Sequence, residues 1–234
     1  MVAGQYWVII PAAGIGKRMQ TDRPKQYLPL AGKTVIQHTL EKLAAVPQVT
    51  GIVVALGAGD RYWDELEINL SRPLKIVEGG QERVHSVFNA ASSMAEELDQ
   101  DDWFLVHDAA RPCVRVTDII RLIDAVKEHD CGGLLATRAS DTLKLSTSKQ
   151  IIDKTIDRSQ IWHALTPQCF RAPLLLKALK KGITNSDVIT DESSAVEAMG
   201  YQPLLVQGRS DNLKITQAED IALAEFYLHR EMQR

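Results

Sequence analysis

The chain has 234 residues, which is enough for one α/β domain with a substantial core. Hydrophobic residues make up 45% of it and charged residues 24%, as in ordinary globular proteins. Its 27 lysines and arginines against 30 aspartates and glutamates give a net charge of −3. This balance argues against a protein that binds nucleic acid by neutralising phosphates.

Neither a membrane span nor a secretion signal is expected. No apolar run approaches the ~20 residues that cross a bilayer, and the N-terminus lacks a charged segment followed by a long apolar one. The three cysteines, Cys113, Cys131 and Cys169, have neither zinc-ligand spacing nor the pattern of a disulfide framework, so we expect them to be packing residues. These features predict a cytoplasmic protein without a membrane partner.

Short apolar runs alternate with amphipathic segments along the chain. The runs are continuous, which is typical of strands covered on both faces, and they span residues 7–10, 51–56, 74–77, 103–106, 133–136 and 204–206. Apolar residues recur at helical spacing over residues 35–44, 84–94 and 119–126. A last helix is expected to begin at Thr216, whose Thr-x-x-Glu spacing to Glu219 matches a capping box. The alternation predicts a Rossmann-like α/β fold, a mostly parallel sheet with helices on both faces.

Residues 138–160 break this rhythm. Two alternating runs, 141–146 and 151–158, flank the polar turn 147–150, which predicts a β-hairpin. An isolated hairpin is marginally stable in water and needs a surface to pack on. It either projects as an arm that packs on a second subunit or lies flat on its own domain, and local sequence leaves both open. We expect residues 1–234 to form a single domain that contains this arm.

The loop from Pro11 to Met19 follows the first predicted strand, where ligands bind in open parallel sheets. Small residues let backbone N–H groups approach an anion closely, and cations accompany them: Ala12, Ala13, Gly14 and Gly16, then Lys17, Arg18 and Lys25. The third glycine of a dinucleotide fingerprint is replaced by Met19, and the P-loop pattern is absent. A tight structural turn with surface cations is the alternative.

The loop and the following Pro24-Lys25-Gln26-Tyr27 resemble the 2-C-methyl-D-erythritol 4-phosphate cytidylyltransferases of the non-mevalonate isoprenoid pathway. Further matching motifs occur in the same order: Gly79-Gly80-x-x-Arg83-x-x-Ser86-Val87, Val106-His107-Asp108-Ala109-Ala110-Arg111-Pro112, Asp157-Arg158, Leu165-Thr166-Pro167-Gln168, Thr190-Asp191-Glu192 and Asp211-Asn212-Leu213-Lys214. The resemblance covers essentially the whole chain.

The resemblance implies an enzyme that transfers CMP from CTP to methylerythritol phosphate and releases pyrophosphate. Arg18 and Lys25 match the residues that stabilise the transition state. The backbone of Ala12 and Ala13, with Gly80 and Ser86, would frame cytosine and ribose. The remaining CTP-side positions are Pro11, Gly14, Gly16, Lys17, Asp108 and Ala109. Gln81 replaces an acidic residue found in some relatives.

A divalent metal, usually Mg²⁺, is implied as well. Asp108 follows an apolar strand, and a carboxylate there suits Mg²⁺, which prefers a few protein oxygens together with phosphate oxygens. The alternative is that Asp108 caps the next turn. We expect the neighbouring His107 to be packed or hydrogen-bonded rather than catalytic.

The attacking group is a phosphate monoester whose second pKa is about 6, so it needs no general base. The resemblance implies that cations hold it and that hydroxyls add contacts: Arg111, Arg158 and Lys214, then Thr142, Thr166 and Thr190. Arg158 and Thr142 lie on the hairpin, which in the family crosses to the partner. The resemblance thus implies a homodimer whose sites are completed in trans, with Arg158 and Lys214 acting beside Arg18 and Lys25.

Two other functions remain open from sequence. One is a cytidylyltransferase for another polyol phosphate, such as ribitol 5-phosphate, which would share the CTP loop and most acceptor cations. The other is a non-catalytic nucleotide-sensing subunit with the same fold, because fold alone does not establish activity. The presence of Arg18, Lys25 and Lys214 together favours an enzyme.

Overall fold

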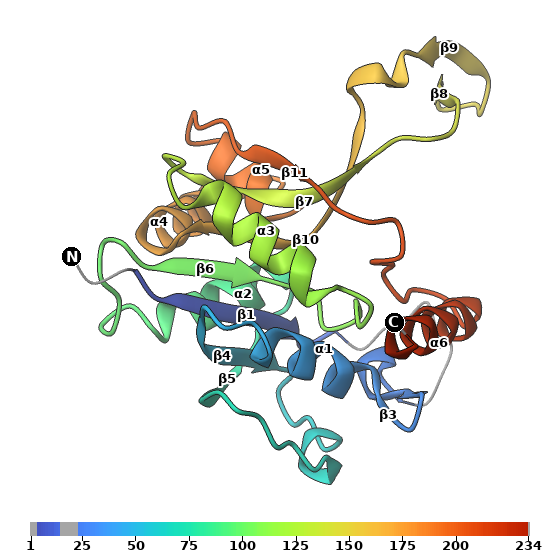
Figure 1. Cartoon of the computed structure of the whole chain (residues 1–234). Helices are drawn as coiled ribbons and strands as arrows, with labels where there is room; N and C mark the ends of the chain where they lie inside the picture. Colours follow the sequence, from blue (N-terminus) through green and yellow to red (C-terminus); the bar gives the residue numbers. More distant parts are fainter. Residues whose placement is uncertain (1–3, 15–22, 234) are drawn as a thin grey trace.

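The computed structural model describes residues 4–14 and 23–233 (Figure 1). A seven-stranded sheet in the order β11-β7-β10-β6-β1-β4-β5 forms its centre. The strands are β1 (Tyr6–Ala12), β4 (Val49–Leu56), β5 (Leu74–Glu78), β6 (Trp103–Val106), β7 (Gly132–Arg138), β10 (Trp162–Arg171) and β11 (Leu204–Gln207). All neighbours run parallel except β10, which is antiparallel to both β6 and β7. The predicted mostly parallel sheet is confirmed.

All six strands predicted from apolar runs are present, whereas β10 was not predicted. This strand contains Pro167, and its ladder to β7 is interrupted between Ala164 and Gln168. A proline within a run argues against a central strand, because it cannot donate to the ladder. The interruption of the ladder around Pro167 is how the sheet accommodates it.

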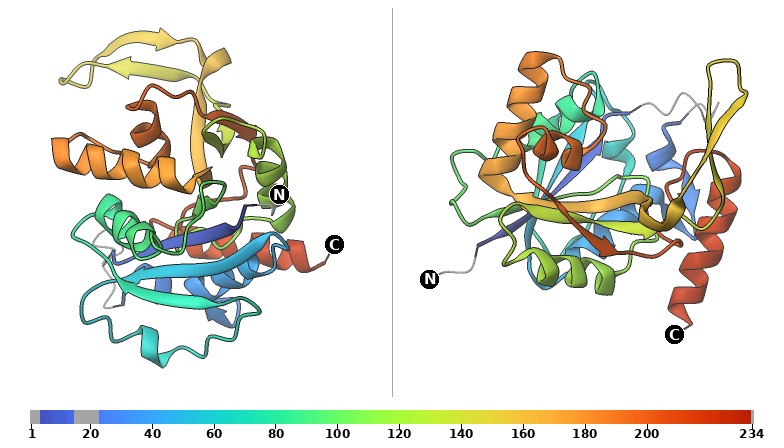
Figure 2. Two further views of the ribbon diagram at one scale, coloured as in Figure 1. Left: turned by 90° about the vertical axis from the view of Figure 1, so that its left-hand side faces the viewer. Right: turned by 90° about the horizontal axis from the view of Figure 1, so that it is seen from above.

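Helices cover both faces of the sheet, as predicted (Figures 1 and 2). They are α1 (Val35–Ala44), α2 (Arg83–Ser92), α3 (Val116–Val126), α4 (Ala172–Asn185), α5 (Glu192–Glu197) and α6 (Glu219–Met232). Val8 and Ile10 of β1 belong to the core that includes α1 and α3, while Ile9 belongs to the core that includes α2, α4 and α5. Successive β1 side chains therefore enter opposite layers, as the period of a strand requires.

The last helix starts three residues later than predicted. It begins at Glu219, and the capping box between Thr216 and Glu219 was wrong. The carboxylate that reaches back belongs instead to Asp220, which accepts hydrogen bonds from the Thr216 N–H at 2.7 Å, the Thr216 hydroxyl at 3.0 Å and the Gln217 N–H at 2.8 Å. Helix α6 packs on the short strand β2 (Pro29–Leu30), which pairs with β3 (Lys33–Thr34), through Leu30, Ala224 and Leu228.

The predicted hairpin is confirmed as β8 (Leu143–Ser146) paired with β9 (Ile152–Ile156). Figures 1 and 2 show it standing away from the main sheet, so it does not lie flat on its own domain. Leu145, Ile151 and Ile152 are exposed, Ile151 and Ile152 to 62% and 61%. The arm therefore presents apolar side chains that its own chain does not cover.

Within the described residues, three 3-10 turns complete the elements: η2 (Lys25–Tyr27), η3 (Trp63–Glu65) and η4 (Arg158–Gln160). Over the ranges 4–14 and 23–233, none of the helices is long and apolar enough to cross a membrane. All three cysteines are free and buried, which confirms the prediction that they are packing residues.

Candidate active site

A cleft of about 850 Å³ opens at the carboxyl ends of β1, β4, β5 and β6. From β1 the chain proceeds to β4 and β5 on one side and then returns to β6 on the other side. The carboxyl ends of strands at such a change of direction are the usual ligand site of an open α/β sheet. The fold thus places Pro11–Gly14, the described part of the predicted phosphate loop, at the edge of the sheet where a ligand is expected.

One wall of the cleft consists of small residues and backbone. A Cβ atom added at Gly79 would lie 2.6 Å from the Ala13 Cβ and 2.9 Å from the Ser86 Oγ, so only glycine fits there. The Gly80 N–H donates to the buried Ser86 hydroxyl at 3.1 Å. This wall lets a flat ligand approach the backbone closely.

The turn that carries Lys25 is joined to the phosphate loop by Gln26. Its buried amide nitrogen donates to the Ala12 carbonyl at 2.8 Å and to the Gly14 carbonyl at 3.2 Å. The Lys25 ammonium lines the cleft and donates to the Ile215 carbonyl at 2.9 Å, beside Lys214 and Thr216. Gln26 was quoted in a sequence motif but was not assigned to the site.

Asp108 lies at the end of β6 among three cations. Its Oδ1 accepts from the Arg83 Nε at 2.9 Å, and its Oδ2 contacts the Lys214 Nζ at 2.9 Å and the Arg111 Nε at 3.4 Å. Burial alone would raise the pKa of this carboxyl, but the charges of Arg83, Lys214 and Arg111 outweigh it and hold the pKa far below its usual range. Asp108 is therefore ionised at any working pH.

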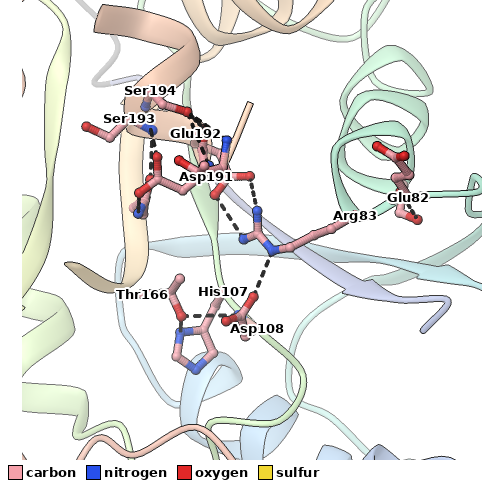
Figure 3. A network of polar contacts seen from close by, with 12 residues as sticks. Glu82, Arg83, His107, Asp108, Thr166, Asp191, Glu192, Ser193 and Ser194 are labelled. Atoms are coloured by element: carbon pink, nitrogen blue, oxygen red, sulfur yellow. Dashed lines mark hydrogen bonds and ion pairs between the residues drawn. The ribbon is translucent and has the colours of Figure 1, made fainter. Parts of the chain in front are cut away.

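Arg83 joins Asp108 to a second carboxylate, Glu192 (Figure 3). The Arg83 Nη1 and Nη2 donate to the two Glu192 oxygens at 2.6 and 3.0 Å, a bidentate contact. Burial lowers the pKa of Arg83, but Glu192 and Asp108 raise it above its usual value. Sequence reasoning missed both residues as site members, although each stood in a quoted motif.

His107 and Thr166 support Asp108 from below (Figure 3). The Arg111 carbonyl can only accept, so the His107 Nε2 at 3.1 Å carries the proton. The His107 Nδ1 then accepts from the Thr166 hydroxyl at 2.9 Å, whose oxygen accepts from the Asp108 N–H at 3.2 Å. Burial lowers the pKa of His107 to about 4, which keeps the ring neutral. The prediction that His107 is hydrogen-bonded is confirmed.

The structure brings most of the predicted CTP-side residues together with Lys25 and Lys214. Those that line the cleft are Pro11, Ala12, Ala13, Gly14, Lys25, Gly80, Ser86, Asp108, Ala109 and Lys214. Gly16, Lys17 and Arg18 lie outside the described residues.

The predicted acceptor residues are more scattered. Arg111 contacts Asp108 and donates to the Asn212 carbonyl at 2.8 Å, and Thr166 is buried under Asp108. Thr190 is exposed in the turn before α5, while Thr142 and Arg158 are exposed on the arm, where Arg158 donates to the Ser140 carbonyl. Of the residues predicted to contact the acceptor, only Lys214 is therefore among the described residues that line the cleft.

Asp108 is one of three acidic residues that line this cleft, together with Glu78 and Glu82, and it is the one that follows β6. In the parts of the chain that the structure describes, no three His, Cys, Asp or Glu side chains form a metal cluster. Magnesium is commonly held by one or two carboxylates plus substrate phosphates, so a single ionised carboxylate is compatible with it.

A mostly parallel sheet with a glycine-walled, cation-lined cleft at its strand ends defines a nucleotide-binding α/β protein. Residues 6–230 match the family model described as 2-C-methyl-D-erythritol 4-phosphate cytidylyltransferase. Relatives with that name include one from Aliivibrio fischeri strain MJ11, 54% identical over 95% of this chain and 93% of the relative. Another, from Vibrio vulnificus strain YJ016, is 49% identical over 97% of this chain and 95% of the relative.

Solved structures give the same result. The crystal structure of the Francisella tularensis 2-C-methyl-D-erythritol 4-phosphate cytidylyltransferase has a TM-score of 0.82 and 40% identity, covering 96% of this chain and all of that chain. A 4-diphosphocytidyl-2C-methyl-D-erythritol synthase gives a TM-score of 0.83 at 36% identity, over 97% of this chain and 100% of that one. The chain belongs to the 2-C-methyl-D-erythritol 4-phosphate cytidylyltransferase family.

Proposed function

We propose that this chain transfers CMP from CTP to 2-C-methyl-D-erythritol 4-phosphate. An oxygen of the acceptor phosphate forms a bond to the α-phosphorus of CTP, the bond from that phosphorus to the β-phosphate oxygen breaks, and pyrophosphate leaves. The products are 4-diphosphocytidyl-2-C-methyl-D-erythritol and pyrophosphate. The proposal depends on the Asp108 cluster, which consists of Asp108 with Arg83, Arg111 and Lys214. Asp108 and Lys214 line one cleft together with the Ala12–Gly14 backbone and Lys25.

Positioning and charge would supply most of the catalysis. The acceptor phosphate, with a second pKa of about 6, is largely ionised at neutral pH and attacks without a base. Negative charge develops at the α-phosphorus and on the departing pyrophosphate, and cations fixed there lower the barrier. Lys25 would supply one such cation, held by its contact with the Ile215 carbonyl, and Arg18 would supply a second.

The acceptor phosphate would bind beside Lys214 and Arg111. The Lys214 side chain is 37% exposed, so its ammonium can contact a ligand while it stays within reach of Asp108. Arg111 is oriented by Asp108 and the Asn212 carbonyl. Thr190 would contribute a hydroxyl from the turn before α5. Thr166 would act mainly by fixing Asp108, since its hydroxyl is engaged by His107 and the Asp108 N–H.

We further propose that Asp108 provides a ligand to Mg²⁺ or another divalent cation. The carboxylate is ionised and faces the cleft, which suits a hard cation. A bound Mg²⁺ would neutralise triphosphate charge and withdraw electrons from the α-phosphorus. Lys214 and Arg111 would remain on the acceptor side of Asp108.

The arm within residues 138–160 would complete the site of a second subunit in a homodimer, while residues 1–234 act as one nucleotidyltransferase domain. The exposed side chains of Leu145, Ile151 and Ile152 support this proposal, because an isolated hairpin needs a surface to cover them. Arg158 and Thr142 would then reach the partner's acceptor pocket. The three buried thiols support a reducing, cytoplasmic location.

Product analysis tests the reaction. Purified protein is incubated with CTP, Mg²⁺ and either methylerythritol phosphate or ribitol 5-phosphate, and both pyrophosphate and the CDP-alcohol are measured. We expect a kcat/KM at least about tenfold higher for methylerythritol phosphate. Equal or better use of ribitol 5-phosphate would overturn the acceptor assignment. The absence of transfer by well-folded protein would favour the non-catalytic alternative.

A further inference from the structure

The Arg83–Glu192 pair connects two elements that are 109 residues apart in the sequence. Arg83 is the first residue of α2 and lines the cleft beside Gly80 and Ser86. Glu192 is the first residue of α5 and follows the turn that carries Thr190. The pair therefore spans from the nucleotide wall to the turn on the acceptor side.

The contact between Arg83 and Glu192 orients the remaining donor of the guanidinium, the Arg83 Nε, toward Asp108. Glu192 is 1% exposed and both of its oxygens contact the same arginine. With the planar fork held in this way, the Arg83 Nε meets the Asp108 Oδ1 at 2.9 Å. The Asp108 Oδ2 is thereby turned to Lys214 and Arg111. The position of Glu192 thus fixes the orientation of a carboxylate that it does not touch.

The α5 turn does not depend on Glu192 for its shape. Gln168 of β10 donates to the Asp191 carboxylate at 2.9 Å and accepts from the Ser193 N–H at 2.8 Å. Asp191 also accepts from the Ser194 N–H at 2.9 Å as the helix cap. Because these contacts secure the turn, the effect of Glu192 falls mainly on Arg83.

We propose that Glu192 and Arg83 are positioning residues that hold Asp108, and through it Lys214 and Arg111, in the arrangement that binds the acceptor phosphate. This inference rests on the proposed function. It assigns to the pair a larger effect on the affinity for the acceptor than on the affinity for CTP, since the wall proposed to hold cytosine and ribose has its own contact between Gly80 and Ser86.

Charge and position predict opposite results, which makes the proposal testable. If Glu192 only lowered the positive charge of the site, then Glu192→Gln would strengthen binding of an anionic acceptor and Glu192→Asp would behave like the wild type. If Glu192 positions Arg83, both variants weaken acceptor binding, because neither keeps a charged bidentate partner at the same reach. Glu197→Gln is the matched control, since Glu197 is exposed on the same helix and accepts from the Ser193 hydroxyl.

The experiment measures kcat and both KM values for wild type, Glu192→Gln, Glu192→Asp and Glu197→Gln. We expect both Glu192 variants to raise KM for methylerythritol phosphate about tenfold and KM for CTP by a smaller factor, about threefold or less, because Asp108 also faces the triphosphate side. The control should match wild type. KM does not depend on the fraction of folded enzyme, so a variant that merely contains less folded protein would have an unchanged KM.

The proposal is overturned by a lower acceptor KM in Glu192→Gln with a wild-type Glu192→Asp, or by unchanged KM values in both. If the Glu192 variants do not fold, Arg83→Lys takes their place, because it keeps a cation but loses the fork. A wild-type acceptor KM in Arg83→Lys would then reject the proposal. Wild-type protein that transfers no CMP would reject the proposed function instead, so the two failures are distinct.

Discussion

The Asp108 cluster and the hairpin arm differ in where their side chains find partners. Asp108 is 7% exposed, and its two oxygens contact Arg83, Lys214 and Arg111 of the same chain. On the arm, Ile151 and Ile152 are exposed to more than half of their surface. The partners of Asp108 therefore all come from its own chain, whereas the apolar side chains of the arm can be buried only against another surface.

This difference indicates separate roles for the two regions in the proposed enzyme. Asp108 and its cations are arranged before any ligand binds, so the protein meets the cost of ordering them during folding. Burying an isoleucine side chain is worth about 1.5–3 kcal/mol, so the exposed isoleucines of the arm favour assembly. In the proposed enzyme, the Asp108 side of the cleft would serve both stability and catalysis, and the arm would serve both assembly and acceptor binding.

The largest expected effect concerns the cleft side of this comparison. Lys25→Ala should lower kcat by about 10²–10³-fold and change KM for CTP by less than about threefold, because the ammonium acts mainly in the transition state. Steady-state kinetics with CTP and methylerythritol phosphate measure both. Lys33→Ala removes an exposed lysine that pairs with Glu41 and should behave like wild type. A Lys25→Ala effect confined to KM would contradict the assigned role.

Mixing inactive subunits tests the arm against the cleft directly. In an equal mixture of Lys25→Ala and Arg158→Ala protein, half of the dimers are hybrids with one intact site, so about a quarter of wild-type activity should return. The matched control is a mixture of Lys25→Ala with Lys214→Ala. Both of these residues belong to the cleft of one chain, so every site stays defective. No recovery in the first mixture, with subunit exchange verified, would place Arg158 outside the partner's site.

A charge on the apolar face of the arm should break the assembly. Ile152→Asp is expected to convert dimers to monomers and to lower kcat/KM for the acceptor about tenfold or more, because an unpaired carboxylate would be buried at the interface. Light scattering reports the mass, and the same assay reports activity. Ser148→Asp adds the same charge at the turn of the arm and should leave the mass unchanged. A dimeric Ile152→Asp protein would show that the arm does not hold the subunits together.

The smallest expected effect concerns His107, which is linked to Asp108 through the Thr166 hydroxyl, and its contribution to the pH dependence of stability. Burial lowers the pKa of His107 from 6.5 to about 4. The unfolded chain binds this proton near pH 6.5 and the folded protein only near pH 4. The contribution of His107 to stability is therefore complete above about pH 7 and lost as the pH falls toward 4. Linkage gives a loss of about 2 kcal/mol between pH 7 and pH 5.

Urea unfolding of wild type and His107→Gln at pH 7 and pH 5 measures this loss. The variant should lose about 2 kcal/mol less than wild type over this interval, whatever its stability at pH 7. A part of the slope should persist in the variant, because burial also lowers the pKa of His38. Equal pH slopes for the two proteins would show that His107 does not remain neutral in the folded state.

Much of the fold could be predicted from the sequence because buried parallel strands leave a local signal. The run at residues 103–106 matches β6 at both ends. Strand β10 has no such signal, because Pro167 and two exposed residues, His163 and Ala164, interrupt its apolar pattern. It is defined by pairing with β6 and β7, contacts that are distant in sequence.

The same distinction holds in the site. Small residues and cations near a strand end identified the Ala12–Gly14 loop and Lys25, since their chemistry is visible locally. Glu192 stood in a quoted motif, yet its function as the partner of Arg83 depends on the approach of α5 to α2. Asp220 likewise replaced Glu219 at the start of α6, since hydrogen-bond geometry rather than spacing selects the carboxylate.

By itself, the sequence determined the parallel core, the small-residue segment Pro11–Gly14 after the first strand, the hairpin and the resemblance to a cytidylyltransferase family. Each of these depends on residues that are close together in the chain. Only the tertiary structure decided that Asp108 contacts Arg83, Lys214 and Arg111 and that the arm stands away from the sheet. Charges from three segments of the chain interact only once the sheet has brought the strand ends together, and no local sequence pattern predicts that contact.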